Sequence, residues 1–217
     1  MDDPEILTPA AFHAAPGVSE WRVLFTGAHA HWRTTSLEQG AALVAAIAGT
    51  VAELDRAPDV DLRPRGVVVR TSRPDHRLDA TDVAVAQRVS AAASALGLEP
   101  DPSVLQVIQL AVAQGPGVDV RPFWNAALGY VDHGPEDSGD PHRRGPWLWF
   151  HDIEPAVNGR GRTHIDVSVP ADVAAVRVQA ALAAGGRLVD DSHAPRWWTL
   201  ASPDNHGVDI AAWPDLG

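Results

Sequence analysis

Cysteine is absent from the 217 residues, and so is lysine, which leaves arginine as the only residue with a permanent positive charge. Disulfides, thiolate catalysis and cysteine zinc sites are therefore excluded, and histidine, carboxylate and amide side chains remain as metal ligands. The 28 acidic residues outnumber the 17 basic ones, giving a formal charge of −11. This charge opposes non-specific binding to nucleic acid or to an anionic membrane, so we expect neither partner.

Long hydrophobic runs are also missing. The longest, residues 40–48, is too short to span a bilayer. The first residues include Asp2, Asp3 and Glu5, where a signal peptide would be basic. Hydrophobic residues make up 45% and charged residues 21%, which is the mixture of a folded globular chain. We expect a cytoplasmic protein of one or two domains.

A break in the pattern at residues 95–103 suggests two domains. Gly97 ends a helical pattern, and Pro100 and Pro102 prevent its continuation. We place the domains at 1–98 and 103–217.

The first domain shows the patterns of two strands and a helix, followed by a third strand and a second helix. Residues 21–25 and 29–34 predict strands, and 36–56 a long helix. A β-branched run within 59–71 predicts another strand, and apolar residues at helical spacing predict a helix over 79–96.

The second domain repeats one arrangement. Its predicted elements form the series strand, helix, strands, which then recurs as a βαβββ unit used twice. The strands are expected at 104–112, 147–151, 164–169, 187–189, 197–200 and 208–213, and the helices at 121–128 and 171–184. Residues 134–145, polar and containing proline, predict a mobile loop.

Four short sequence motifs follow one another along the first domain. They are Gly-Val-Ser-Glu-Trp at 17–21, Ala-Glu-Leu-Asp-Arg-Ala-Pro-Asp at 52–59, Val-Val-Val-Arg-Thr at 67–71 and Leu-Asp-Ala-Thr-Asp at 78–82. With them the domain resembles the pterin-4a-carbinolamine dehydratase family over nearly its whole length. The resemblance implies dehydration of a hydroxylated tetrahydropterin by histidines near a carboxylate.

The histidines of that family are replaced here. Arg56 and Ala57 stand before Pro58, where the family carries two histidines, and Ser72 occupies a third histidine position. Arg56 cannot act as a base near neutral pH, although it can hold a carboxylate or phosphate. We therefore favour a catalytically degenerate domain.

Two acidic positions of the family are retained, at Glu53 and Asp82. One alternative is an active lyase in which Glu53, His76 and Asp82 act as acid and base, and it predicts that His76 reaches the Asp82 carboxylate. The other, which we favour, is that Asp79 caps a helix and Asp82 interacts with its N-terminal dipole.

Residues 103–217 resemble a vicinal-oxygen-chelate domain of the glyoxalase and bleomycin-resistance type. The matching segments are 123–124, 128–130, 145–150, 162–167, 185–186, 197–198, Leu200, Pro203, Ile210 and Trp213. In that superfamily each βαβββ module forms half of a cup. The two resemblances together predict an α+β protein: a dehydratase-like sheet with long helices on one face, followed by the paired modules.

Enzymes of this superfamily bind a divalent ion through side chains of facing strands. His164 occupies a common ligand position, and Asp166 shares its strand face. The usual glutamate of the last strand is missing, and Asp209 and His151 are the substitutes, beside Gln106 and Gln109. A divalent metal is thus possible, but a hydrogen-bonded core histidine is the interpretation that we favour.

Tryptophans supply the candidate ligand-binding residues. Those proposed for a flat ligand are Trp124, Trp147, Trp149, Trp197 and Trp198, together with Arg56 of the first domain. Strand alternation places Trp147 and Trp149 on one side, where only one of the adjacent pair 197–198 can join them.

The sequence supports three functional hypotheses. We favour a protein that binds or transforms a cyclic or aromatic small molecule, with His164, Asp166 and Asp209 as polar groups. The second is a dehydratase-type lyase acting on a pterin-like compound, and the third is a non-catalytic interaction module. Homodimerisation is expected from the dehydratase resemblance and from the alanine-rich segment 42–52.

Overall fold

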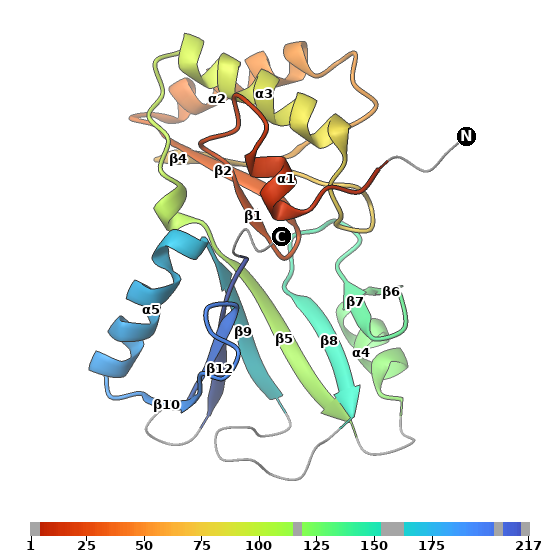
Figure 1. Ribbon diagram of the computed structural model, residues 1–217. Coiled ribbons are helices and arrows are strands. Elements are labelled where there is room, and N and C mark those ends of the chain that lie inside the picture. The colour runs from red at the N-terminus through yellow and green to blue at the C-terminus, as the bar shows by residue number, and fades with distance from the viewer. Residues whose placement is uncertain (1–4, 115–118, 153–162, 202–205, 214–217) are drawn as a thin grey trace. The chain divides into compact units, whose positions relative to one another are not determined.

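The computed structural model describes residues 5–114, 119–152, 163–201 and 206–213. The chain is divided into two compact units (Figure 1). One runs to Leu105 and includes Trp213, and the other comprises Gln106–Ala212. Each unit has its own β-sheet with helices, so the fold class is α+β. None of the helices in the described residues is long and apolar enough to cross a membrane.

The first unit has a four-stranded antiparallel sheet in the order β1-β2-β4-β3. The helices α2 and α3 pack together and both contact the sheet. The elements are α1 (Pro9–His13), β1 (Arg22–Leu24), β2 (Gly27–Arg33), α2 (Leu37–Thr50), β3 (Asp59–Arg63), β4 (Gly66–Thr71), α3 (Ala80–Ala95) and a 3₁₀ turn (Pro102–Val104). The expected single strand within 59–71 is a hairpin, and α1 lacked the length to give a periodic pattern.

Alternation along the strands builds the core of this unit. Ala30 and Trp32 of β2 lie opposite Val69 and Val67 of β4, and all four are buried. Leu43 and Ile47 of α2, with Val85 and Val89 of α3, complete the same apolar cluster. The helices thus cover one face of the sheet because apolar side chains at strand spacing meet apolar side chains at helical spacing.

The second unit contains the duplicated βαβββ arrangement that the sequence predicts. The first module comprises β5 (Val107–Gln114), α4 (Arg121–Leu128), β6 (Val131–His133), β7 (Asp137–Gly139) and β8 (Trp147–Asp152). The second comprises β9 (Thr163–Val169), α5 (Ala171–Ala183), β10 (Arg187–Asp190), β11 (Trp197–Ala201) and β12 (Gly207–Ala212). Gly129 ends α4 in the left-handed conformation, as expected.

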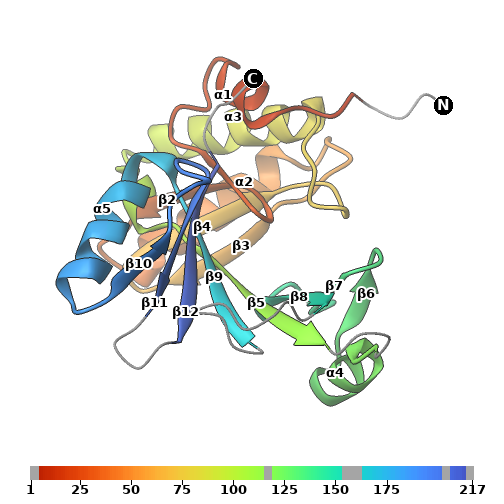
Figure 2. The same cartoon turned by 60° about the horizontal axis from the view of Figure 1, so that its bottom comes forward.

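All strands of the two modules join one sheet in the order β10-β11-β12-β9-β5-β8-β7-β6. Figure 2 shows the central strands β12, β9, β5 and β8 side by side. In each module the first and last strands run parallel, and the modules meet where β5 pairs antiparallel with β9. The segment predicted as a mobile loop contains β7, which pairs with both β6 and β8.

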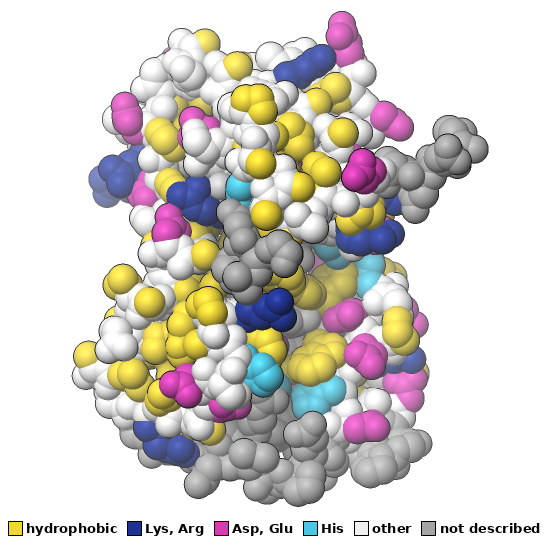
Figure 3. Space-filling view, viewed as in Figure 1, with side chains coloured by type: hydrophobic (Ala, Val, Ile, Leu, Met, Phe, Trp, Pro, Cys, Tyr) yellow, Lys and Arg dark blue, Asp and Glu magenta, His cyan; other side chains and the backbone are white. Residues whose placement is uncertain are grey.

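The two faces of this sheet differ in chemistry. One face carries apolar residues that pack with residues of α4 and α5, including Val112, Leu148, Phe150, Val169, Leu200 and Ile210. We call the opposite face the histidine face, because His133, His151 and His164 belong to it by strand alternation and register. Figure 3 shows histidine side chains beside hydrophobic and acidic ones on the second unit, the lower part of the picture.

Candidate functional site

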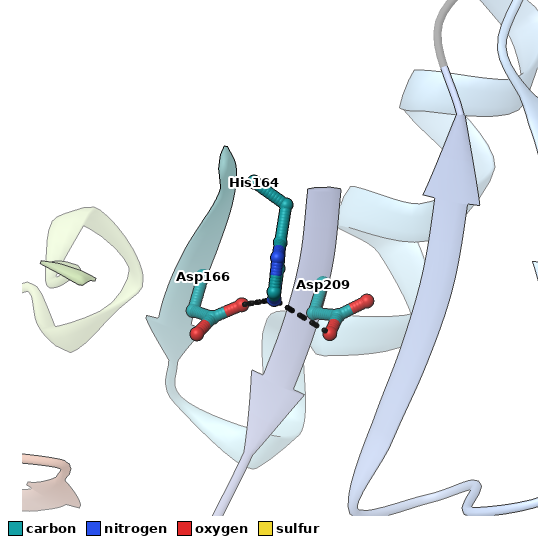
Figure 4. A group of neighbouring side chains, drawn as sticks. All are labelled: His164, Asp166 and Asp209. Carbon is teal, nitrogen blue, oxygen red and sulfur yellow. Dashed lines mark ion pairs between the residues drawn. The ribbon is translucent and has the colours of Figure 1, made fainter. Parts of the chain in front are cut away.

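Three polar side chains converge on the histidine face of the second module (Figure 4). His164 and Asp166 alternate along β9, and Asp209 of β12 is the register partner of Asp166. His164 Nε2 lies 3.3 Å from Asp166 Oδ1 and 3.7 Å from Asp209 Oδ2. One potential ligand atom from each residue falls within 4.8 Å of the others. The sequence named all three residues, and the structure brings them together.

This cluster is sheltered from solvent. The side chain of His164 is only 3% exposed, and those of Asp166 and Asp209 are 17% and 12% exposed. His164 Nε2 and Asp166 Oδ1 are buried atoms without a hydrogen-bond partner among the described residues. Buried polar atoms are normally paired, so this arrangement favours a further group that completes their interactions.

A row of aromatic rings adjoins the cluster. The ring of His151 stacks on Trp149 at 4.5 Å between centroids and meets His164 edge-on at 5.7 Å. His151 Nδ1 lies 2.9 Å from the carbonyl oxygen of Asp152, whereas its Nε2 is buried without a hydrogen-bond partner in the described structure. His151 thus adjoins His164 but is not one of the three residues whose ligand atoms converge.

The tryptophans divide between the two faces as strand alternation requires. Trp147, Trp149 and Trp197 belong to the histidine face. Trp198 packs in the apolar cluster below α5, and Trp124 packs against the cluster that contains Phe150. Of the five candidate tryptophans, these two therefore line the helix-covered face and not the face of the histidine cluster.

Asp137 is a residue of this face that sequence reasoning missed, because it lies in the segment predicted as a loop. Its Oδ1 accepts a 2.8 Å hydrogen bond from Trp147 Nε1. Burial raises the pKa of the Asp137 carboxyl, while the Trp147 hydrogen bond opposes the shift. The His133 ring lies 4.6 Å from that of Trp147, and a Cβ on Gly139 would come within 2.6 Å of the indole. The signal in the sequence was that Asp137 and Gly139, two residues apart, would share one face of a strand.

The first unit holds a separate ionic network, among the residues from which the sequence predicted a dehydratase-like site. Arg56 Nη1 donates to Asp82 Oδ2 at 2.5 Å and to Asp79 Oδ1 at 3.1 Å, and Nη2 donates to Asp79 Oδ2 at 3.1 Å. Thr71 Oγ1 donates to the other Asp82 oxygen at 2.6 Å. Arg56 thus contacts Asp82, one of the residues proposed as acid or base, and the neighbouring Asp79.

The two carboxylates also begin α3. Asp79 is its N-cap residue and accepts from the backbone N–H of Thr81, while Asp82 accepts from the N–H of Asp79. This reciprocal pattern is a capping box, as the favoured interpretation of the sequence required. Burial acts to raise the pKa of Asp79, but hydrogen bonds from Arg56 and Thr81 outweigh it and lower the pKa. Hydrogen bonds and charges of both acids likewise outweigh burial and raise the pKa of Arg56.

The remaining candidates of the first unit are His76 and Glu53. His76 has a positive φ of 64°, and its Nδ1 lies 3.4 Å from the carbonyl oxygen of Thr26. Glu53 is exposed. Of the proposed acid and base residues, Asp82 pairs with Arg56, and Glu53 is open to solvent.

A known protein family matches the second unit. The family model described as "Glyoxalase-like domain" matches residues 109–211. Residues 109–211 form a glyoxalase-like domain. No curated protein matches the chain.

The glyoxalase-like domain contains the cluster of His164, Asp166 and Asp209 within its matched range. The turn in which the sequence shows no glutamate, at 203–205, lies outside the described residues. The two modules of the domain differ: the second supplies the carboxylates around His164, whereas the last strand of the first supplies Trp147, Trp149 and His151.

Proposed function

We propose that the glyoxalase-like domain binds or transforms a small cyclic or aromatic molecule on its histidine face. The observation that carries this proposal is the buried, incompletely paired cluster of His164 and Asp166 next to the stacked rings of Trp149 and His151. Aromatic walls with a few convergent polar groups are typical of small-molecule sites. Glyoxalase-like domains as a class support the same interpretation.

Each group has a distinct chemical role in this proposal. The indole of Trp149 offers a flat surface for a ring, and Trp147 extends the apolar surface on the neighbouring row. His164 Nε2 can donate or accept one hydrogen bond depending on its tautomer, and Asp166 and Asp209 accept hydrogen bonds when ionised. A ligand that presents donor groups beside a ring would satisfy the buried atoms.

A screen of cyclic small molecules by ligand-observed NMR tests this proposal. We expect compounds that bind the wild type to lose binding in both Trp149→Leu and His164→Ala. Val176→Ala serves as the control, because Val176 is an exposed residue of the helix that covers the other face. Binding that survives in both site variants would contradict the proposal.

A divalent metal ion is a second candidate for the cluster, since its donor set fits one. An imidazole nitrogen and two carboxylate oxygens are ligands that zinc and related ions accept. Ligands bound at about 2.0–2.2 Å in tetrahedral geometry lie roughly 3.3–3.6 Å apart, close to the 3.3 Å between His164 Nε2 and Asp166 Oδ1. Such an ion would supply a Lewis acid for a substrate oxygen.

Elemental analysis of protein purified without a metal-chelating tag tests this candidate. Stoichiometric metal in the wild type, lost in His164→Ala and in Asp209→Asn, would support it. Wild-type protein that binds no zinc, manganese or iron after incubation with the ions would contradict it. The organic-ligand proposal does not depend on this result.

For the first unit we propose a dehydratase-like scaffold without dehydratase chemistry. The support is the placement of Arg56, which pairs with Asp79 and Asp82 where the family resemblance implies histidines. An arginine whose pKa is raised further cannot take a proton near neutral pH. We expect the protein to leave a 4a-hydroxytetrahydropterin to dehydrate at its spontaneous rate, and acceleration abolished in Asp82→Asn would contradict this.

A further inference from the structure

Acidic side chains dominate the histidine face. Strand register assigns to it Asp137 of β7, Asp166 of β9, Asp209 of β12 and Asp190 of β10. Among the described strand residues that share this face, the only arginine is Arg187, on the edge strand β10. A carboxylate or phosphate on a ligand would meet repulsion from this face, whereas a positive group would be attracted.

Asp137 and His164 lie in a single cross-strand row. Asp137 is the register partner of Trp149, Trp149 pairs with Ala111, and Ala111 pairs with His164. Three strand spacings separate the two ends of the row, which is about 14 Å along the sheet. Trp149 lies within this row, and the ring of His151, two residues further along β8, stacks on it at 4.5 Å. The row thus has an acid at one end and, at the other end, a histidine that lies beside Asp166 and Asp209.

The surroundings of Asp137 suit a cation. Trp147 Nε1 donates to one oxygen of the carboxylate, which fixes the orientation of both groups. The register partner of Asp137 on the neighbouring strand is Trp149, and cations interact favourably with aromatic faces. Burial raises the pKa of Asp137 and the charge of Glu136 adds to the shift, while the Trp147 hydrogen bond and the charge of His133 oppose it, so ionisation is costly. A ligand cation would offset that cost.

We infer that the ligand is an organic cation, a cyclic or aromatic amine or amidine, and that Asp137 is the carboxylate that selects its positive group. The inference rests on the proposed function, because it assigns the chemical class of the molecule bound on this face. In this arrangement the ring of the ligand stacks on Trp149. Its donor groups reach Asp137 at one end and the cluster around His164 at the other.

Three probes that share a naphthalene ring and differ in charge test whether the site prefers a cation. These are 1-naphthylmethylammonium, 1-naphthylmethanol and 1-naphthoate, whose dissociation constants can be measured by calorimetry. We expect the ammonium probe to bind at least about tenfold more tightly than the carboxylate probe, with the alcohol between them. Equal or tighter binding of the carboxylate, or binding of none of the three, would overturn the inference.

Asp137→Asn tests the assigned residue, since the amide keeps an oxygen acceptor for Trp147. We expect this variant to lose most of the preference for the ammonium probe while it binds the alcohol as the wild type does. Asp172→Asn removes the same charge from α5 on the other face and should keep the preference. An unchanged preference in Asp137→Asn would overturn the role of Asp137. Alcohol binding that is lost in Trp149→Leu would still support the proposed function, so the two failures are distinguishable.

Discussion

Arg56 is the residue on which the ionic network of the first unit depends. Its side chain is 15% exposed, and those of Asp79 and Asp82 are 2% and 0% exposed. We expect Arg56→Met to destabilise the protein by about 3–5 kcal/mol, because it leaves the buried Asp82 carboxylate without a counter-ion and Asp79 with Arg73 alone, at 3.5 Å. Urea unfolding at pH 7 followed by circular dichroism measures the change.

An exposed pair in the same unit provides the matched control. Arg63 pairs with Asp61, and these side chains are 74% and 54% exposed. Arg63→Gln should change the stability by less than about 1 kcal/mol, because water already solvates both charges. Similar losses in the two variants would contradict the importance assigned to burial of the network.

Protonation of Asp79 gives the network a defined pH dependence. Its pKa is lowered below the ordinary value of 3.8, so its contribution is present above that value and is lost as the pH falls through the lower, folded-state pKa. Removal of Arg56 removes the main cause of the lowering. We expect the loss of stability in Arg56→Met to be largest near pH 7 and to shrink as the pH falls below about 4, and an equal loss at both pH values would contradict this.

The pKa of Asp137 is shifted in the opposite direction, so its effect on stability has the opposite pH dependence. A raised pKa favours the protonated carboxyl in the folded state, so its contribution is present at low pH and is lost as the pH rises through the folded-state pKa. Asp137→Asn cannot ionise. We expect its melting temperature to equal or exceed that of the wild type at pH 7, and the difference to shrink as the pH falls to about 4. A variant that is less stable only at pH 7 would contradict this.

At the scale of elements, substitution of two glycines of α2 by alanine is expected to change stability in opposite directions. A Cβ on Gly40 would collide with Leu62 Cδ1 and lie 3.2 Å from Val67 Cγ2, whereas a Cβ on Gly49 would meet nothing within 4 Å. Gly40→Ala should destabilise by about 1–3 kcal/mol through displacement of α2 from the sheet. Gly49→Ala should stabilise by about 0.5 kcal/mol, because alanine favours the helix. Thermal unfolding of the two variants distinguishes these outcomes.

The elements that the sequence predicted well are those with long periodic patterns or clear end signals. The capping box of Asp79 and Asp82 and the glycine after α4 follow from local chemistry, and the duplicated βαβββ order follows from repetition. Short elements gave no such signal. The helix α1 has five residues and β7 has three, and pairing with β6 and β8 is what makes β7 a strand.

Strand alternation predicted the part of the candidate site that lies on one strand, and Asp209 was named as a substitute for the glutamate of the resembled superfamily. His164 and Asp166 share a face because strand side chains alternate, and the same rule joins Trp147 to Trp149. Register between strands decides the rest: it places Asp209 opposite Asp166 and Trp197, instead of Trp198, on the histidine face. Asp137 depends on two such registers, so a single sequence could not assign it.

At the scale of the whole molecule, the charge of −11 adds to the local effect of the histidine face. Salt screens interactions between charges with a Debye length of about 8 Å at 0.15 M ionic strength. We expect higher ionic strength to weaken binding of the ammonium probe while the alcohol probe is unaffected. Calorimetry in 0.02 M and 0.5 M sodium chloride checks this, and equal salt dependence of the two probes would contradict it.

The pairing of β5 with β9 joins the two modules along six residue pairs, from Val107 opposite Ser168 to Val112 opposite Thr163. A ligand that touches Asp137 and His164 contacts strands on both sides of this seam and therefore resists twisting of one module against the other. Amide hydrogens of β5 and β9 should then exchange with solvent more slowly in the complex. A ligand held by one module alone would slow exchange only there, so the rate of exchange at the seam shows whether one molecule bridges both halves of the duplicated sheet.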